Sequence, residues 1–285
     1  MTPLRYLIVP LFAVVACAVS ATSAPGATYE WDFRNGHFDN LSLVPMGSGA
    51  VNLLVPTREG LRMALPAGYD VKALGFSPRF TLRGDFEVTV EFTILSRTLP
   101  KSGHGTGPSI YLSTGSTQDP AASIGRLLRP DGRDIHGLFA ARIDDGKRVP
   151  TARLINVADS KVMSGRLQLK RSQGEITYSA GEGRNAPLRP LATLSMGKGE
   201  VTMLRIGVSQ SDPQSSAVVV LHNVRIEAAE LPHIPSETSR TAQLYRPRYQ
   251  PPPAPSSRRW LWQALAALGL AVAAGSWWWK RSSNI

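Results

Sequence analysis

The sequence predicts an all-β fold class, an antiparallel jelly-roll sandwich of the concanavalin-like kind, for residues 28–231. Apolar and polar residues alternate there with the period of two expected of strands buried on one face. Glycine-containing turns separate these runs every ten to fifteen residues. No sustained 3.6-residue apolar stripe of an amphipathic helix interrupts them. Some 200 residues are enough for one large sandwich.

The N-terminus, residues 1–24, is predicted to be a signal peptide. Arg5 precedes an apolar run from Tyr6 to Val19, and small residues follow from Ser20 to Ala27. A basic start, an apolar centre and a small-residue exit are typical of a secretory signal. The main domain is therefore expected outside the cytoplasm, in the periplasm or on the cell surface.

Cys17, the only cysteine, leaves a second interpretation open. The run Val14 to Cys17 resembles a bacterial lipobox, in which the cysteine is lipidated and becomes the new N-terminus. The apolar run continues past Cys17, which favours its loss with the signal peptide. In either case the mature domain has no disulfide, and a domain of this size does not need one.

The strands of the sandwich are expected at alternating runs separated by turns. A continuous apolar run, Val218 to Leu221, predicts a strand covered on both faces. The alternating runs are Tyr29 to Phe33, Phe86 to Phe92, Arg166 to Lys170, Val201 to Val208 and His222 to Ile226. The expected turns are Asn35-Gly36, Arg83-Gly84-Asp85, Asp131-Gly132, Asp145-Gly146 and Gln173-Gly174.

The C-terminal part predicts a tether. Residues 232–259 carry seven prolines and read as a semi-rigid, basic polyproline stalk. Trp260 to Trp279 follow without a charge, which is about 30 Å of helix and enough to span a bilayer. Tryptophans at both ends suit the membrane interface. We expect a single-pass cell-membrane anchor with residues 280–285 as its cytoplasmic tail.

The net charge of +11 does not indicate nucleic-acid binding, because its distribution is uneven. Residues 28–231 hold 24 Lys and Arg against 20 Asp and Glu, whereas residues 232–285 hold seven against one. More than half of the excess therefore lies beside the predicted membrane, where cations attract anionic surfaces. Nucleic acid is not an expected partner.

Three groups of residues resemble an uncharacterised family of secreted planctomycete proteins, a domain of unknown function. They are Gly84 to Thr89, the run Ala122 to Arg126 with Arg129 to Gly132, and Gly165 to Arg171 leading to Ile176 to Tyr178. The resemblance covers residues 28–231. The same strands, with Val224 to Ile226, are similar to concanavalin-like and laminin-G-like jelly rolls. That resemblance implies two large antiparallel sheets and a concave face that often binds glycans.

The best candidate for catalysis is the strand Glu87-Val88-Thr89-Val90-Glu91. Alternation places Glu87, Thr89 and Glu91 on one face, as in glycoside hydrolases that use two carboxylates. The central position holds Thr89 rather than an acid, which removes a charge that would tune its neighbours. A solvated strand face is the alternative interpretation, and we expect no enzyme activity.

The remaining candidates concern binding. The loop Gly103-His104-Gly105 is followed by a strand, not by the helix that a phosphate loop requires, and could form the rim of a binding face. The histidines lack metal-ligand spacing, and His222 lies in a strand as a structural residue. No resident cofactor is expected. Calcium has weak candidate ligands in Asp131, Asp134, Asp144 and Asp145, although turns favour aspartate for its local hydrogen bonds.

The expected function is that of a membrane-anchored binding or scaffolding module whose partner is a glycan or another envelope protein. Exposed aromatic platforms would support a glycan, but the alternation of Trp31 with Tyr29 and Phe33 places it in the core. The alternative is an enzyme resembling a glycoside hydrolase that uses Glu87 and Glu91.

Overall fold

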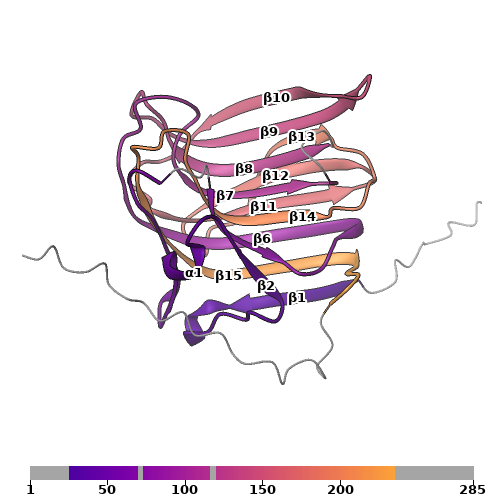
Figure 1. Cartoon of the computed structure of the whole chain (residues 1–285). Coiled ribbons are helices and arrows are strands. Elements are labelled where there is room, and N and C mark those ends of the chain that lie inside the picture. Colours follow the sequence, from indigo (N-terminus) through magenta and orange to yellow (C-terminus); the bar gives the residue numbers. More distant parts are fainter. Residues whose placement is uncertain (1–25, 70–72, 116–119, 235–285) are drawn as a thin grey trace, which may run out of the picture.

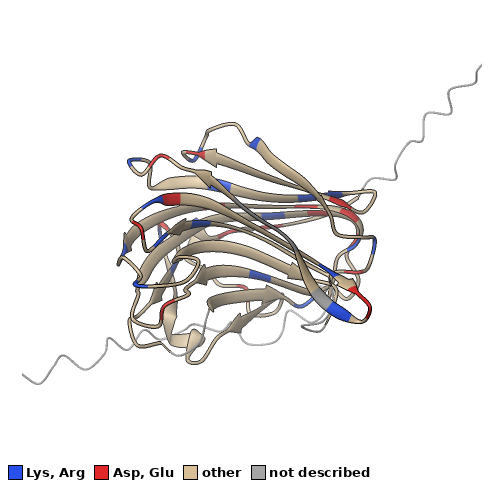
Figure 2. Ribbon diagram, turned by 90° about the horizontal axis from the view of Figure 1, so that it is seen from above, with Lys and Arg blue, Asp and Glu red and all other residues tan. Residues whose placement is uncertain are grey.

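The computed structural model describes residues 26–69, 73–115 and 120–234. Within these ranges fifteen strands, all paired antiparallel, form two stacked sheets that we call sheet A and sheet B (Figure 1). Seen from above, the sheets form two curved layers (Figure 2). The predicted all-β antiparallel sandwich is confirmed.

Sheet A has eight strands in the order β13-β12-β11-β6-β15-β4-β3, with β1 also paired to β15. The strand β15 is central, because β6 lies along one of its edges while β4 and β1 share the other. The strands are β1 (Ala27–Asp32), β3 (Leu54–Thr57), β4 (Gly60–Leu65), β6 (Arg83–Arg97), β11 (Ser164–Ser172), β12 (Glu175–Glu182), β13 (Arg189–Ser195) and β15 (Ala217–Glu230).

Sheet B has seven strands in the order β10-β9-β8-β7-β14-β5-β2. Its middle strands, β7 and β14, pair from Met203 opposite Ser113 to Ser209 opposite Gly107. The strands are β2 (Leu43–Met46), β5 (Ala73–Pro78), β7 (Gly107–Ser113), β8 (Ala121–Leu128), β9 (Asp134–Asp144), β10 (Lys147–Val157) and β14 (Met203–Ser209).

Two of the predicted turns close hairpins between neighbouring strands. Asp145-Gly146 joins β9 to β10 and Gln173-Gly174 joins β11 to β12, and all four residues have positive φ. That backbone matches the twist of paired strands. Asp131-Gly132 lies in the connection between β8 and β9, also as predicted, with Gly132 in the left-handed region.

The turn predicted at Arg83-Gly84-Asp85 is wrong, because these residues begin β6. Gly84 has a φ of 73° beside a register shift against β15, so it forms a bulge and the strand continues. Two short helices were also not expected, η1 (Phe33–Asn35) and α1 (Ala50–Leu53). The first is a single turn that Asp32 caps and that Gly36, from the predicted turn Asn35-Gly36, ends in the left-handed conformation.

The core between the sheets is built as the alternation predicts. Phe86, Val88, Val90 and Phe92 of β6 all point inward and are at most 3% exposed. Trp31 is also core, and its indole N–H donates to the Ser42 hydroxyl at 2.9 Å. Its aromatic faces are therefore not available as a platform for a ligand.

The continuous run Val218 to Leu221 lies in the central strand β15. Val219 and Leu221 pack in the core, and Val220, on the other face of the sheet, is only 2% exposed. Val218 is half-buried. The predicted burial on both faces thus holds for most of the run.

A buried ion-pair cluster, the Asp134 triad, joins the two sheets. Asp134 of β9 accepts hydrogen bonds from Arg97 of β6 at 2.6 and 3.1 Å and from Arg126 of β8 at 2.9 and 3.2 Å. All three side chains are at most 5% exposed. Arg126 also donates to the carbonyl oxygens of Asp159 and Val162, at 2.6 and 3.2 Å.

Several predictions fall outside the described residues. They are the signal peptide (1–24) with Cys17, most of the stalk (232–259), the membrane segment Trp260 to Trp279 and the tail 280–285. Among residues 26–69, 73–115 and 120–234, no helix has the length and apolar character to cross a membrane.

Candidate functional site

The outer face of sheet A carries the predicted carboxylates, each opposite a cation. Glu87 accepts a hydrogen bond from Gln168 at 2.8 Å and lies 3.3 Å from the Lys170 ammonium. Glu91 lies 3.7 Å from Arg166, longer than a hydrogen bond. Both cations belong to β11, where Arg166 pairs with Glu91 and Lys170 with Glu87 in register.

Thr89 stands between the two glutamates, and its hydroxyl accepts from the Gln168 amide at 3.1 Å. The structure thus confirms that Glu87, Thr89 and Glu91 share a face. Opposite charges paired across strands are typical of a solvated sheet surface. Neither glutamate lines the pocket that lies farther along the same strand.

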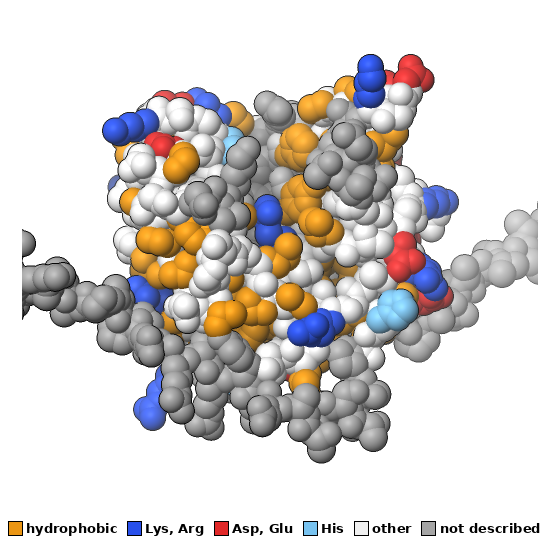
Figure 3. Space-filling view, in the orientation of Figure 1, with side chains coloured by type: hydrophobic (Ala, Val, Ile, Leu, Met, Phe, Trp, Pro, Cys, Tyr) orange, Lys and Arg blue, Asp and Glu red, His pale blue; other side chains and the backbone are white. Residues whose placement is uncertain are grey.

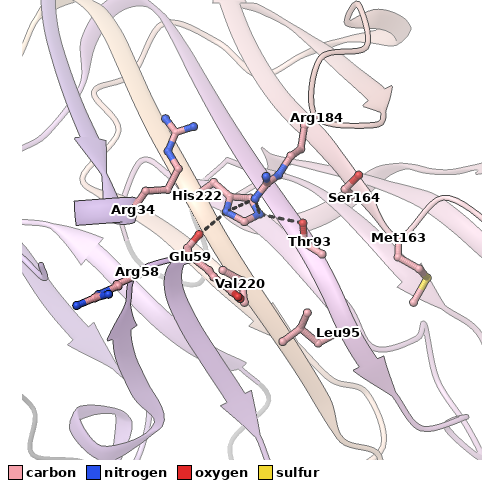
Figure 4. A pocket seen from close by; sticks show the side chains of 10 residues that line it. All are labelled: Arg34, Arg58, Glu59, Thr93, Leu95, Met163, Ser164, Arg184, Val220 and His222. Carbon is pink, nitrogen blue, oxygen red and sulfur yellow. Dashed lines mark hydrogen bonds between the residues drawn. The ribbon is translucent and has the colours of Figure 1, made fainter. Parts of the chain in front are cut away.

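That pocket, the His222 pocket, has a volume of about 620 Å³ (Figure 4). Its walls come from segments far apart in the chain, which the sheet topology brings together. They are Arg34, Arg58, Glu59, Thr93, Leu95, Met163, Ser164, Arg184, Val220 and His222.

His222 forms the centre of this pocket and is 2% exposed. Its Nδ1 lies 2.7 Å from the carbonyl oxygen of Glu59, which can only accept, so Nδ1 carries the proton. Nε2 is then the acceptor, 2.8 Å from the Thr93 hydroxyl and 2.6 Å from the Arg184 guanidinium. Arg184 also lies 2.7 Å from Nδ1, a contact that the protonated nitrogen cannot accept as a hydrogen bond.

The charge state of His222 follows from these surroundings. Burial lowers the pKa of the imidazole, and the Glu59 carbonyl partly opposes this by holding the Nδ1 proton. The positive charges of Arg184 and Arg34 lower the pKa further. His222 is therefore a neutral imidazole at neutral pH.

The outer face of sheet B differs from that of sheet A. Figure 3 looks onto it and shows a hollow near the centre with a Lys or Arg side chain in it, among hydrophobic and uncharged side chains. The pairing register places Arg205, Tyr111, Ser123 and Phe139 in one row across β14, β7, β8 and β9.

Arg205 is half-buried in that row, and its guanidinium lies over the Tyr111 ring at 5.1 Å from the centroid. Burial lowers the pKa of Arg205. Among the described residues no carboxylate pairs with it. The adjacent row carries glycine at Gly207, Gly125 and Gly137, and the Leu127 side chain packs beside the last two.

Gly207 and its partner Gly75 on β5 are required by close packing of the backbone. A Cβ on Gly207 would lie 2.1 Å from the Leu74 carbonyl oxygen, and one on Gly75 would lie 2.2 Å from that of Ile206. Real Cβ atoms do not approach so closely, so this part of the face cannot be filled by side chains.

The predicted rim loop, Gly103 to Gly105, comes just before β7 and lies next to the C-terminal ends of β8 and β14. Gly105 donates its N–H to the Ser211 hydroxyl at 2.8 Å, and Thr106 bridges to Leu128. A Cβ on Gly103 would meet Ser211 at 2.4 Å. The loop therefore packs against Ser211 and borders sheet B.

The candidate calcium ligands are not brought together. Asp134 is occupied by two buried arginines, Asp131 binds Arg133 at 2.7 Å and Asp144 lies 3.2 Å from Arg142. Asp145 occupies the hairpin turn with a φ of 48°. The described ranges contain no group of three His, Cys, Asp or Glu residues that could hold a metal. The geometry gives no support for calcium at these residues.

The sequence did not indicate the arginines of either site. His222 was interpreted as structural, and its hydrogen bonds agree with that, but it also lines a pocket. Arg184 and Arg58 lie 38 and 164 positions before it in the chain. Only the pairing of β4 with β15 could have placed Arg58 beside it.

Comparison with known families gives one match. The model described as "Protein of unknown function (DUF1583) C domain" matches residues 13–252. No curated protein matches the chain in sequence.

Solved structures similar to this one have low sequence identity to it. LamA from Z. galactanivorans, in complex with laminaritriose and laminaritetraose, is 9% identical with a TM-score of 0.50, covering 71% of this chain and 98% of its own. A prokaryotic β-1,3-1,4-glucanase (lichenase) from a mouse hindgut metagenome is 10% identical, with a TM-score of 0.49 and coverages of 71% and 99%. The VIP36 exoplasmic/lumenal domain, bound to Ca²⁺ and Man3GlcNAc, is 12% identical, with a TM-score of 0.45 and coverages of 70% and 89%. At these identities the similarity to LamA supports the fold alone.

Proposed function

We propose that this chain, which belongs to the family described as protein of unknown function (DUF1583) C domain, is a non-catalytic module that binds a glycan on the outer face of sheet B. The single observation that carries the proposal is Arg205. Its guanidinium is half-buried in the central row of a hollowed face and has a ring contact with Tyr111 but no carboxylate among the described residues. A charged group held in this way has donors available for a ligand.

The chemistry of this face suits a sugar chain. Arg205 offers several donors, Ser109 and Ser123 carry hydroxyls, and Tyr111 and Phe139 lie in the same row as Arg205. The hollow visible on this face leaves room for a ligand above Arg205's sheet (Figure 3). LamA, which shares the fold, was solved with bound laminari-oligosaccharides. An envelope protein is the other partner that such a face could accept.

We further propose that the module works outside the cytoplasm, tethered to the cell membrane. This rests on the sequence of residues 1–24, 232–259 and 260–279. Removing residues 260–285 should move the protein from the membrane fraction to the soluble extracytoplasmic fraction. If the shortened protein stays with the membrane, the proposed anchor is wrong.

The rival function is a glycoside hydrolase that uses Glu87 and Glu91. The structure favours it less, because each carboxylate faces a cation on β11 and Thr89 stands between them. The two glutamates also lie on sheet A, the opposite face from Arg205.

The deciding experiment measures retention and cleavage together. The full chain in a non-ionic detergent is applied to immobilised polysaccharides, and released reducing ends are assayed in parallel. We expect retention on at least one polysaccharide without release of product. Arg205→Gln should reduce retention about tenfold or more, the scale of a lost charge-assisted hydrogen bond.

The matched control is Arg225→Gln, which removes an arginine from the central strand of sheet A, where it pairs with Glu227. It should leave retention unchanged. Product release that Glu91→Gln abolishes would replace our proposal by the hydrolase. If Arg205→Gln leaves retention unchanged, the polysaccharide binds at another face and the proposed site is wrong.

A further inference from the structure

The His222 pocket, on the outer face of sheet A, is large enough for an organic molecule. Its volume of about 620 Å³ lies within the range of small-molecule sites. The proposed glycan face belongs to sheet B, so the two sites lie on opposite faces of the sandwich.

Two of the three arginines in this pocket form no ion pair with the described residues. Arg34 makes two hydrogen bonds to Asp32, at 2.7 and 3.1 Å. Arg184 has only His222 as a polar partner, and Arg58 has no hydrogen-bond or ion-pair partner among the described residues. Glu59 is the one acid among the ten lining residues, so the lining carries an excess of positive charge.

Another part of the pocket wall is apolar. Leu95, near the end of β6, is 51% exposed, and Met163 and Val220 also line the pocket. Figure 4 shows Leu95 and Met163 away from Arg34 and Arg58. Apolar walls with a few convergent polar groups are characteristic of small-molecule sites.

We propose that this pocket binds a small organic oxyanion, a molecule whose carboxylate, sulfate or phosphate group lies between Arg58 and Arg184 and whose remainder packs on Leu95 and Met163. Guanidinium groups are well suited to this task, because their paired donors match the oxygens of such groups. A free acid and an acidic residue of a polymer share this chemistry.

His222 has a positioning role in this proposal. The Glu59 carbonyl fixes the proton on Nδ1, so Nε2 presents its lone pair toward Thr93, while the Arg184 guanidinium lies against the ring, 2.6 and 2.7 Å from its two nitrogens. A neutral imidazole can therefore hold the Arg184 guanidinium over the pocket without neutralising its charge. A carboxylate in the same place would cancel that charge and remove the site.

The test uses the full chain in a non-ionic detergent and isothermal titration calorimetry with four sugars of similar size. Glucuronate, glucose 6-sulfate and glucose 6-phosphate carry the three oxyanions, and glucose is the neutral reference. We expect at least one charged sugar to bind at least tenfold more tightly than glucose, and more weakly as salt is added.

Two independent substitutions locate the binding. Arg184→Met and Arg58→Gln should each weaken the charged sugar about 10- to 100-fold, the range of a charge-assisted hydrogen bond. Arg58 is exposed in the short connection between β3 and β4, so its replacement does not threaten the fold. Arg166→Gln removes a cation on the same face that is paired with Glu91 and does not line the pocket, and it should weaken the charged sugar less than either pocket substitution.

Three outcomes would overturn the proposal. They are equal affinity for glucose and all three charged sugars, no binding of any charged sugar, or a loss with Arg166→Gln that equals the loss with Arg184→Met. Circular dichroism of each variant confirms that it is folded. Because Arg205 and sheet B take no part in this site, none of these outcomes would decide the proposed glycan binding.

Discussion

The Asp134 triad and the His222 pocket are two arginine-rich regions separated only by the segment around Met163. Arg126 of the triad donates to the Val162 carbonyl, and Met163 and Ser164 line the pocket. In the triad two arginines converge on one buried carboxylate. In the pocket Arg184 and Arg58 form no ion pair with any carboxylate that the structure describes, and Arg184 contacts a neutral histidine instead.

The difference separates charges that hold the fold together from charges available to a ligand. Buried ions are tolerated when each is paired and hydrogen-bonded. The triad meets this condition and links β6 of sheet A to β8 and β9 of sheet B. Arg58 and Arg184 of the pocket do not meet it, and they are exposed at a surface where water or a ligand can satisfy them.

The largest test of this contrast removes the carboxylate from the triad. Asp134→Asn leaves Arg97 and Arg126 buried without a counter-charge, which should lower the free energy of unfolding by about 3–5 kcal/mol. Urea unfolding followed by circular dichroism measures the loss. Asp131→Asn, which removes a carboxylate from an exposed pair, should change the free energy of unfolding much less. Equal losses would show that the triad does not hold the sheets together.

The pH dependence of stability tests the surroundings of the triad. Burial and the charge of Arg126 lower the pKa of His136 from 6.5 to about 4. The full contribution of His136 to stability is present above pH 6.5, where the histidine is neutral in both states. As the pH falls from 6.5 to about 4, the unfolded chain binds a proton that the folded chain does not.

The loss over this interval should reach about 3 kcal/mol. His136→Gln should show a flatter dependence of the free energy of unfolding on pH, measured by urea unfolding at pH 7 and pH 4.5. Parallel curves for the variant and the wild type would mean that His136 does not titrate in this way. His222, whose pKa is also lowered, changes stability in the same direction in both proteins.

A smaller effect is expected in the pocket. Thr93→Val removes the hydroxyl 2.8 Å from His222 Nε2, but Arg184 can still donate to that nitrogen. The free energy of unfolding should therefore fall by only about 1 kcal/mol, the value of one hydrogen bond. Thr177→Val, which loses an exposed hydroxyl contact with Thr193, is the matched control. A loss above that for Asp134→Asn would place the pocket among the elements that hold the fold.

The smallest effect should come from the paired carboxylates of sheet A. Glu87→Gln and Glu91→Gln remove ion pairs in which the glutamates are 31% and 27% exposed, so each should cost between about 0 and 1 kcal/mol. Thermal unfolding of both variants beside the wild type is sufficient to detect this. A larger loss for Glu91→Gln would indicate that this glutamate does more than neutralise Arg166.

Alternation made much of the fold predictable. A period of two in Phe86 to Phe92 fixes which side chains face the core, and so it placed Glu87 and Glu91 outside correctly. The hairpin turns at Asp145-Gly146 and Gln173-Gly174 were predictable for the same local reason, since few residues adopt positive φ. The turn prediction at Gly84 was wrong because bulges and turns both favour glycine at a positive φ.

The two sites were not predictable, because register determines them. Arg58 meets His222 through the pairing of β4 with β15, and Arg205 meets Tyr111 through β14 and β7. Each pair is separated by more than 90 positions, and nothing in the sequence near Arg205 distinguishes it from a solvated arginine. That none of the described carboxylates pairs with Arg205 is visible only in three dimensions.

The position of β15 has a consequence for how the domain is made. The last strand of the sandwich pairs with β6, β4 and β1, and Ala228 lies opposite Ala27. Until residue 230 has emerged, sheet A lacks its centre and β1 has no partner. Synthesis or translocation must therefore deliver nearly the whole domain before sheet A can form. The domain begins with β1 and ends with β15, and these two strands lie side by side.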